Sequence, residues 1–170
     1  MSAPQVCQGY WRNPTADAES FFERDGKRYF RSGDLGYRDP DGFFYLKDRL
    51  KRMVNASGYK VWPAEVEGML SEHPAIHESC VIAAADAYRG ETVKAVIVVR
   101  EEWRGKTTDT DVIEWARERM AAYKYPRIVE FVDALPRAST GKIDWRSLQE
   151  KELGLNRQPA ISKAAGESES

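Results

Sequence analysis

Residues 79–85 (SCVIAAA) and residues 92–99 (TVKAVIVV) are two apolar runs separated by a short polar stretch, and together they decide the fold. Runs of this kind, bounded by polar residues and rich in β-branched side chains, are typical of strands that are covered on both faces. A third run, from Arg127 to Val132, has a similar character. We therefore expect a small three-stranded sheet in the second half of the chain.

A helix is predicted just before the first of these strands. Pro63 suits the first helical position, the apolar residues Val66, Met69 and Leu70 form one stripe, and Pro74 stops the helix. A helix of this kind can cover one face of the expected sheet.

Two further helices are predicted downstream. Thr108 and Asp111 resemble a capping box for a helix over Asp109–Tyr123, and Asp144 caps a last helix that ends near Gly154. The fold class that follows is α+β, with a small three-stranded sheet and packed helices, preceded by a short β-rich segment.

The part of the chain before the sheet is rich in turn signals. Asp25-Gly26 lies between two short aromatic segments, as in a tight hairpin, and residues 39–42 (DPDG) mark a second turn that leads into a strand. We divide the chain into residues 1–50, a terminal β-rich segment, residues 51–154, a compact domain, and residues 155–170, a polar tail that we expect to be disordered.

The composition excludes several classes of protein. With 26 Lys and Arg against 27 Asp and Glu, the formal net charge of -1 gives no broad basic field for nucleic acid or an anionic membrane. The apolar runs are far shorter than a membrane span, and no signal peptide is visible at the start. Cys7 and Cys80 cannot form a disulfide framework, and Cys80 fits a small buried hydrophobe, so a cytoplasmic location is expected.

Residues 136–143 (PRASTGKI) carry the sharpest local signal. They resemble the end of a phosphate-binding P-loop, but Pro136 and Ile143 stand where that motif needs Gly and then Ser or Thr, so a P-loop is rejected. We interpret the segment as a mobile loop of small residues that presents Lys142 to a polyanion just before a helix. The alternative is an exposed loop with a solvated lysine.

Two further residues could contact a nucleotide. Asp34, in the turn 33–36, could accept hydrogen bonds from the vicinal hydroxyls of a ribose, or it could simply cap that turn. Arg49 could bind a ribose or a phosphate, or it could belong to a solvated basic face over residues 47–52. His73 and His77 are four residues apart, but Pro74 breaks any helix that would align them, so no metal site is expected.

The order of these signals resembles the AMP-forming acyl-CoA synthetases of the adenylate-forming superfamily. The resemblance runs from about Val6 to Leu153. The matching segments are residues 33–35 (GDL), 39–43 (DPDGF), 48–51 (DRLK), 57–67 (SGYKVWPAEVE), 89–91 (RGE), 124–126 (KYP) and 136–142 (PRASTGK).

The resemblance covers only the C-terminal end of such an enzyme. It implies that residues 1–50 are the last β-rich segment of the N-terminal domain plus a hinge, and that residues 51–154 are the C-terminal AMP-binding-enzyme domain. The Ser/Thr/Gly-rich phosphate loop, the acyl pocket and the Mg²⁺-associated acidic motif of the N-terminal domain have no counterpart in these residues. We therefore expect contact with that missing domain, Mg²⁺ bound through it, and no activity from this chain alone.

The resemblance also assigns residues to the first of two reaction steps. In that step a carboxylate attacks the α-phosphate of ATP, giving acyl-AMP and pyrophosphate. Asp34 would bind the ribose, Arg49 the AMP portion, and Lys142 would bridge the carboxylate and the α-phosphate. Asp144 departs from the pattern of many relatives, and Arg146 could take over the outer basic position.

In the second step, the thiol of coenzyme A displaces AMP. Lys51 matches the hinge about which the C-terminal domain rotates between the two steps. The loop Ser57-Gly58-Tyr59 matches the segment that contacts CoA, and Arg89 matches a position that can pair with the CoA phosphates.

The function expected from this resemblance is the C-terminal part of a medium- or long-chain fatty acyl-CoA ligase, with ATP and CoA as substrates. Residues 60–63 (KVWP) are more similar to long-chain members of the family. Two alternatives stay open: a stand-alone module that binds CoA or AMP, and an adenylation domain that loads a carrier protein instead of free CoA.

Overall fold

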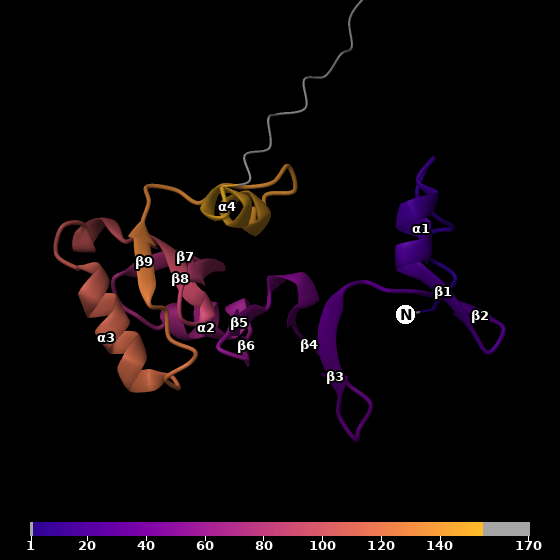
Figure 1. Cartoon of the computed structure of the whole chain (residues 1–170), viewed down its shortest axis with the longest axis horizontal. Coiled ribbons are helices and arrows are strands. Elements are labelled where there is room, and N and C mark those ends of the chain that lie inside the picture. Colours follow the sequence, from indigo (N-terminus) through magenta and orange to yellow (C-terminus); the bar gives the residue numbers. More distant parts are fainter. Residues whose placement is uncertain (1, 155–170) are drawn as a thin grey trace, which may run out of the picture. The chain divides into compact units, whose positions relative to one another are not determined.

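The computed structural model describes residues 2–154, so the tail expected over residues 155–170 lies outside the described residues. The chain forms two compact units, Met1–Met53 and the part that begins at Val54 (Figure 1). The boundary predicted from the sequence lies three residues earlier, between residues 50 and 51. Each unit is described by itself.

The first unit consists of a short helix followed by two hairpins. Asp25 and Gly26 have φ values of 52° and 69°, the left-handed torsions that a tight two-residue hairpin turn requires, so the hairpin predicted at this pair is confirmed. The elements of this unit are α1 (Pro14–Ser20), β1 (Phe21–Arg24), β2 (Lys27–Phe30), β3 (Asp34–Arg38), β4 (Phe44–Arg49) and the 3₁₀ turn η1 (Leu50–Arg52).

The second hairpin pairs β3 with β4 around the predicted turn 39–42. The Asp39 carboxylate accepts a hydrogen bond from the backbone N–H of Phe43 at 2.9 Å, which closes the turn. A bulge interrupts the pairing beside Gly36, and a Cβ atom built there would lie 2.6 Å from the Tyr45 carbonyl oxygen. Only glycine allows the two strands to approach this closely.

The second unit is built on one five-stranded sheet in the order β6-β5-β8-β7, with β9 also paired to β8. The pairing of β9 with β8 is parallel and the other pairings are antiparallel. The elements are β5 (Val54–Ala56), β6 (Tyr59–Val61), α2 (Pro63–Leu70), β7 (Ile76–Asp86), β8 (Gly90–Val99), η2 (Glu101–Trp103), α3 (Asp109–Arg119), β9 (Ile128–Phe131) and α4 (Trp145–Glu152).

The α+β class is confirmed, and the three predicted strands are β7, β8 and β9. The prediction of only three strands is corrected, because β5 and β6 extend the sheet. These two strands have three residues each and include polar side chains, so they lack the apolar run that marks a strand in sequence.

Both faces of the sheet are covered, which explains the continuous apolar run of β8. Val93, Ala95 and Ile97 belong to a core cluster shared with α2 and α3, whereas Val96 and Val98 belong to a second cluster on the other face. The side chains alternate between the two clusters because successive residues of a strand point to opposite faces. The helices α2 and α3 therefore lie on one side of the sheet and α4 on the other.

The predicted helices all form, with two of them shorter than expected. α2 ends at Leu70, before Pro74, and α3 ends at Arg119 rather than Tyr123. The capping box of Thr108 and Asp111 is confirmed, with both reciprocal hydrogen bonds present.

Polar side chains hold α4 against the sheet. Lys94, on the same face as Val96, is buried and pairs with Glu130 of β9 at 2.7 Å and with Glu152 of α4 at 2.5 Å. The amide of Gln149 exchanges two hydrogen bonds with the backbone of Ala83, on the outer edge of β7. These contacts cover an edge strand that would otherwise offer unpaired backbone groups.

A buried histidine lies beside the N-terminal part of β7 and makes the stability of this unit depend on pH. The His73 Nδ1 accepts a hydrogen bond from the Ala75 N–H at 3.1 Å, and the ring packs edge-on against Trp115. Burial lowers the pKa of His73 below its ordinary value, the nearby Arg119 lowers it further, and Asp111 opposes them. The neutral imidazole is therefore the form that suits the folded state.

We predict that acidification weakens the fold partly through His73. Below about pH 6.5 the unfolded chain binds a proton at this histidine more readily than the folded chain, so the free energy of unfolding falls as the pH falls. The His73→Asn variant should be less stable than the wild type but should lose a smaller part of its stability between about pH 7.5 and pH 5. Urea unfolding at the two pH values measures this, with the exposed His77→Asn as the matched control. An equal loss in His73→Asn and the wild type would contradict the prediction.

Within residues 2–154, no helix is long and apolar enough to cross a membrane.

Candidate functional site

Lys142 lies in a short hydrogen-bonded hairpin, not in an open loop. The Ala138 N–H donates to the Lys142 carbonyl at 2.8 Å, and the Asp144 N–H donates to the Pro136 carbonyl at 2.7 Å. The turn between them closes through a bond from the Gly141 N–H to the Ala138 carbonyl at 2.8 Å, and Gly141 has a φ of 79°. The loop predicted over residues 136–143 is therefore folded into a hairpin by three backbone hydrogen bonds, and its mobility stays a prediction.

The hairpin presents the lysine side chain outward. Lys142 is exposed, and among residues 2–154 its ammonium group forms no ion pair. The next residue, Ile143, packs into the second core cluster, and Asp144 caps α4 through Ser147. Hydrogen bonds from Ser147 also lower the pKa of the Asp144 carboxyl below its ordinary value. Asp144, the residue that departs from the pattern of many relatives, therefore serves as a helix cap.

Asp34 and Arg49 face each other in the first unit. They are paired residues of β3 and β4, and the Arg49 Nε lies 2.8 Å from the Asp34 Oδ1. Arg49 also donates to the Ser32 carbonyl at 3.3 Å. The pair places a carboxylate and a guanidinium side by side at the end of a hairpin, where together they offer both acceptors and donors to a ribose phosphate.

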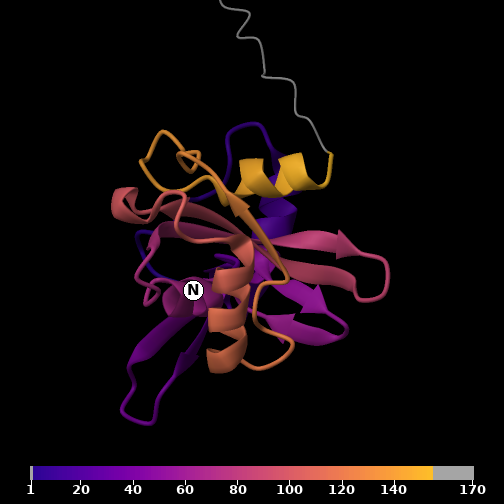
Figure 2. The ribbon, with the colours of Figure 1, turned by 90° about the vertical axis from the view of Figure 1, so that its left-hand side faces the viewer.

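The loop Ser57-Gly58-Tyr59 joins β5 to β6 and lies beside the turn that carries Arg89. Ser57 and Gly58 have φ values of 54° and 85°, so the chain turns tightly at this pair. The Ser57 N–H donates to the Arg89 carbonyl at 3.2 Å. Figure 2 shows the β5–β6 and β7–β8 turns next to each other, so residues about thirty positions apart in sequence come together.

A pocket of about 320 Å³ opens at these two turns and is lined by Ser57, Tyr59 and Arg89. It is also lined by residues that the sequence analysis did not select: Ala56, Tyr88, Thr92, Ala122, Tyr123, Tyr125 and Arg127. Lys142 is not among the lining residues. The pocket combines aromatic rings with two guanidinium groups, a combination that suits an aromatic base and phosphates.

The added wall of this pocket comes from the segment between α3 and β9. Tyr123 stacks on Tyr59 with ring centroids 4.6 Å apart, and Arg127 lies over the ring of Tyr125. Lys124 pairs with Glu65 of α2, and this hydrogen bond raises the pKa of Lys124. Lys124, in the motif at residues 124–126, thus links this wall of the pocket to α2. The contribution of this segment to the pocket could not be predicted from the sequence, because it depends on the pairing of β9 with β8.

Lys51 lies in the 3₁₀ turn η1, at the end of the first unit. The residue is exposed, and the Met53 N–H closes the turn on the Leu50 carbonyl. A single short turn between two compact units is a place where a few backbone torsions can change without disturbing a core.

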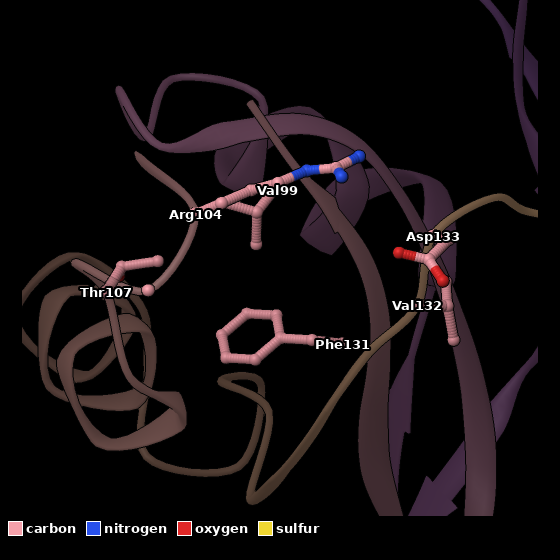
Figure 3. A pocket seen from close by; sticks show the side chains of 7 residues that line it. Val99, Arg104, Thr107, Phe131, Val132 and Asp133 are labelled. Carbon is pink, nitrogen blue, oxygen red and sulfur yellow. The ribbon is translucent and has the colours of Figure 1, made fainter. Parts of the chain in front are cut away.

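A second pocket, of about 230 Å³, lies at the ends of β8 and β9 (Figure 3). The ring of Phe131 points into it, and Arg104 and Asp133 lie at its rim. Arg104 also pairs with Glu101 at 3.2 Å. None of the residues selected in the sequence analysis lies in this pocket.

No group of three His, Cys, Asp or Glu residues that could hold a metal ion is present in the part of the chain that the structure describes. His73 is engaged with the Ala75 backbone, and Cys80 is buried in the second core cluster, as expected for a small hydrophobe.

The chain is similar to several known proteins. Residues 65–142 match the family described as AMP-binding enzyme C-terminal domain. The long-chain-fatty-acid–CoA ligase of Bacillus subtilis (strain 168) is 44% identical over 152 residues, which is 89% of this chain and 26% of that protein. The oxalate–CoA ligase of Saccharomyces cerevisiae is 39% identical over 145 residues, 85% of this chain and 26% of that protein.

Solved structures show the same likeness. ATP-bound MatB from Rhodopseudomonas palustris aligns with a TM-score of 0.75 and 36% identity over 87% of this chain and 28% of that one. The o-succinylbenzoate CoA synthetase of Bacillus subtilis, in complex with its acyl-adenylate intermediate, aligns with a TM-score of 0.74 and 32% identity over 86% of this chain and 29% of that one.

The chain therefore carries the AMP-binding enzyme C-terminal domain, which is the C-terminal domain of adenylate-forming enzymes. Within that class, both curated relatives described above are CoA ligases. The chain spans about a quarter of the length of these relatives.

Proposed function

We propose that this chain is the C-terminal part of an ATP-dependent, AMP-forming ligase that converts a medium- or long-chain fatty acid to its CoA thioester. In the first step a carboxylate oxygen bonds to the α-phosphorus of ATP while the bond from that phosphorus to the leaving pyrophosphate breaks. In the second step the CoA sulfur bonds to the acyl carbon, its proton is lost, and AMP leaves.

The observation that carries this proposal is the pocket at the β5–β6 and β7–β8 turns. It joins Ser57, Tyr59 and Arg89, three of the four residues that the resemblance assigns to CoA, in one wall with Arg127. The guanidinium groups of Arg89 and Arg127 suit the phosphates of CoA, and the exposed ring of Tyr59 suits its adenine. Gly58, at the tip of the turn, lets the backbone approach the ligand closely.

The first step would use the other set of residues. Asp34 would accept hydrogen bonds from the ribose hydroxyls, and Arg49 would bind the AMP portion. The exposed ammonium of Lys142 would lie between the attacking carboxylate and the α-phosphate, where negative charge gathers in the transition state. Mg²⁺ would be held by the N-terminal domain, to which the resemblance assigns the Mg²⁺-associated acidic motif.

The two steps require different faces of the second unit, since Lys142 is not part of the pocket. Because backbone bonds fix the Lys142 hairpin, we expect the lysine to leave the site by movement of the whole unit, about Lys51, rather than by unfolding of the hairpin. Such alternation would withdraw the cation and bring the CoA pocket to the acyl-AMP.

Contact with the N-terminal domain is supported by the β3–β4 hairpin. Phe43, Phe44 and Leu46 have exposed fractions of 67%, 80% and 79%. A cluster of large apolar side chains on one hairpin is typical of a surface that packs against another part of a protein. We infer that the rest of the N-terminal domain of the ligase, to which this hairpin belongs, covers these side chains.

The fatty acid is proposed from the Bacillus subtilis relative, which is named for long-chain fatty acids. The second relative is named for oxalate, so similarity over this segment does not by itself determine the acid. The location that goes with this function is the cytoplasm, where ATP and CoA are available.

The first test uses this 170-residue chain alone. We predict that it releases no pyrophosphate from ATP and a long-chain fatty acid above the uncatalysed rate, because it holds only part of each site. The ligase that contains this domain should release pyrophosphate under the same conditions. Robust turnover by the chain alone would contradict the proposal.

Two further measurements test the alternative functions: calorimetry of the same chain with CoA and with AMP, and an assay of acyl transfer by the ligase that contains this domain. Tight binding of CoA or AMP would favour a stand-alone binding module. Transfer of the acyl group to a phosphopantetheinylated protein, and not to free CoA, would favour an adenylation domain that loads a carrier.

A further inference from the structure

Arg137 is placed to hold the backbone on which Lys142 stands. Its guanidinium donates through Nη1 to the Gly141 carbonyl at 2.9 Å and through Nη2 to the Glu78 carboxylate at 2.5 Å. Gly141 is the residue immediately before Lys142, and Glu78 belongs to β7, 59 residues away from Arg137 in sequence. One planar group thus joins the turn of the hairpin to the sheet.

The residue on the other side of Lys142 is fixed as well. Ile143 pairs with Arg137 in an isolated antiparallel bridge, and its side chain packs in the second core cluster with Leu135 and Trp145. Lys142 therefore stands between a carbonyl held by Arg137 and a side chain held by the core. Without the guanidinium, the turn from Ala138 to Gly141 would keep its backbone bonds but lose its connection to β7.

We propose that Arg137, supported by Glu78, is a positioning residue for Lys142 in the adenylation step. This inference rests on the proposed function of Lys142. An ammonium that must stabilise charge on two crowded oxygens acts best when its place is set in advance. Arginine suits this task because its rigid planar fork can hold a carbonyl and a carboxylate at the same time, which the single ammonium of lysine does less well.

The first measurement is made on the 170-residue chain without any substrate. NMR relaxation gives order parameters for the backbone amides of Gly141 and Lys142. In Arg137→Met both order parameters should fall below the wild-type values, while those of the α4 residues stay unchanged. Unchanged values at Gly141 and Lys142 would overturn the proposal.

The second measurement follows the two half-reactions in the ligase that contains this domain. Adenylation is followed as pyrophosphate release from ATP and a long-chain fatty acid, and thioester formation is followed from supplied acyl-AMP and CoA. Arg137→Met should lower kcat for adenylation by about 10- to 100-fold, because a displacement of about 1 Å can cost this much. The KM for ATP and the thioester half-reaction should stay within about twofold of the wild type, which corresponds to less than about 0.5 kcal/mol.

Two milder variants keep the proposal testable if Arg137→Met folds poorly. Glu78→Gln leaves the bond to Gly141 in place, and Arg137→Lys leaves a charge that can still pair with Glu78. Both should show a smaller loss of adenylation than Arg137→Met, again with the thioester step spared. Arg104→Met is the matched control, because Arg104 also pairs with a glutamate and its side chain is 51% exposed against 49% for Arg137.

The outcomes separate this inference from the function on which it rests. If Lys142→Ala abolishes adenylation and Arg137→Met does not change it, the positioning role is wrong and the role of Lys142 stands. If Arg137→Met lowers both half-reactions equally, Arg137 is merely structural and the inference is overturned. If Lys142→Ala itself leaves adenylation unchanged, the proposed function fails and the positioning role fails with it.

Discussion

Replacement of Lys142 by alanine is expected to slow adenylation by about 10²- to 10³-fold, or about 3–4 kcal/mol of transition-state stabilisation. The ammonium is exposed on a hydrogen-bonded hairpin, so its removal should disturb no core contact and leave the folded structure intact. Thioester formation from supplied acyl-AMP should stay within about twofold of the wild type, since the α-phosphate is already bonded to the acyl group in that substrate. Separate assays of pyrophosphate release and acyl-CoA formation in the ligase that contains this domain measure the two effects.

Lys106→Ala is the matched control for this prediction. Lys106 is also an exposed lysine of the second unit, and it does not line the pocket at the β5–β6 and β7–β8 turns. Both half-reactions should be unchanged in this variant. An equal loss of both half-reactions in Lys142→Ala would show that the lysine does not act specifically in the first step.

The Lys51→Pro variant is expected to affect the two half-reactions unequally. Proline fixes φ near −65°, a value compatible with the 3₁₀ turn in which Lys51 lies, so one conformation should be retained while rotation about this residue is blocked. The overall rate should fall by at least about tenfold, or about 1.4 kcal/mol, because each turnover needs both conformations. One half-reaction, measured alone, should stay near its wild-type rate.

Lys51→Ala separates the backbone from the charge at this position. It removes the ammonium group but leaves φ free, so both half-reactions and the overall rate should stay close to the wild type. A loss in Lys51→Ala as large as that in Lys51→Pro would show that the charge, and not the rotation, is what matters. Equal loss of both half-reactions in Lys51→Pro would also contradict a hinge at this residue.

Features that depend on neighbouring residues could be predicted from the sequence. The hairpin at Asp25-Gly26 forms because two residues with positive φ suit a tight turn between paired strands. The capping box of Thr108 and Asp111 forms because its donors and acceptors are three residues apart. The order of the motifs along the chain was sufficient to indicate the adenylate-forming family, which the comparisons support.

Features that depend on distant partners could not be predicted. The strands β5 and β6 are short, and they are stabilised by pairing within a sheet whose centre is β8. The pocket gains Tyr123 and Arg127 because the segment before β9 is brought to β8, where the Arg127 N–H donates to the Val93 carbonyl.

The roles assigned to Asp34, Arg49, Ser57, Gly58, Tyr59, Arg89 and Lys142 stay predictions until the half-reactions are measured.

The hairpin that carries Lys142 shows which features could not be predicted from the sequence. The run of small residues before Lys142 favours a mobile loop, because small side chains bury little surface and Gly141 leaves the backbone unusually free. The guanidinium of Arg137 instead reaches both the Gly141 carbonyl and Glu78 on a strand 59 residues away. The sequence by itself determined the longer helices and strands of the second unit, the family and the residues worth testing, because those follow from local spacing and from motif order. Only the tertiary structure decided which residues share a pocket and how firmly Lys142 is held, since both depend on contacts that form after the sheet has assembled.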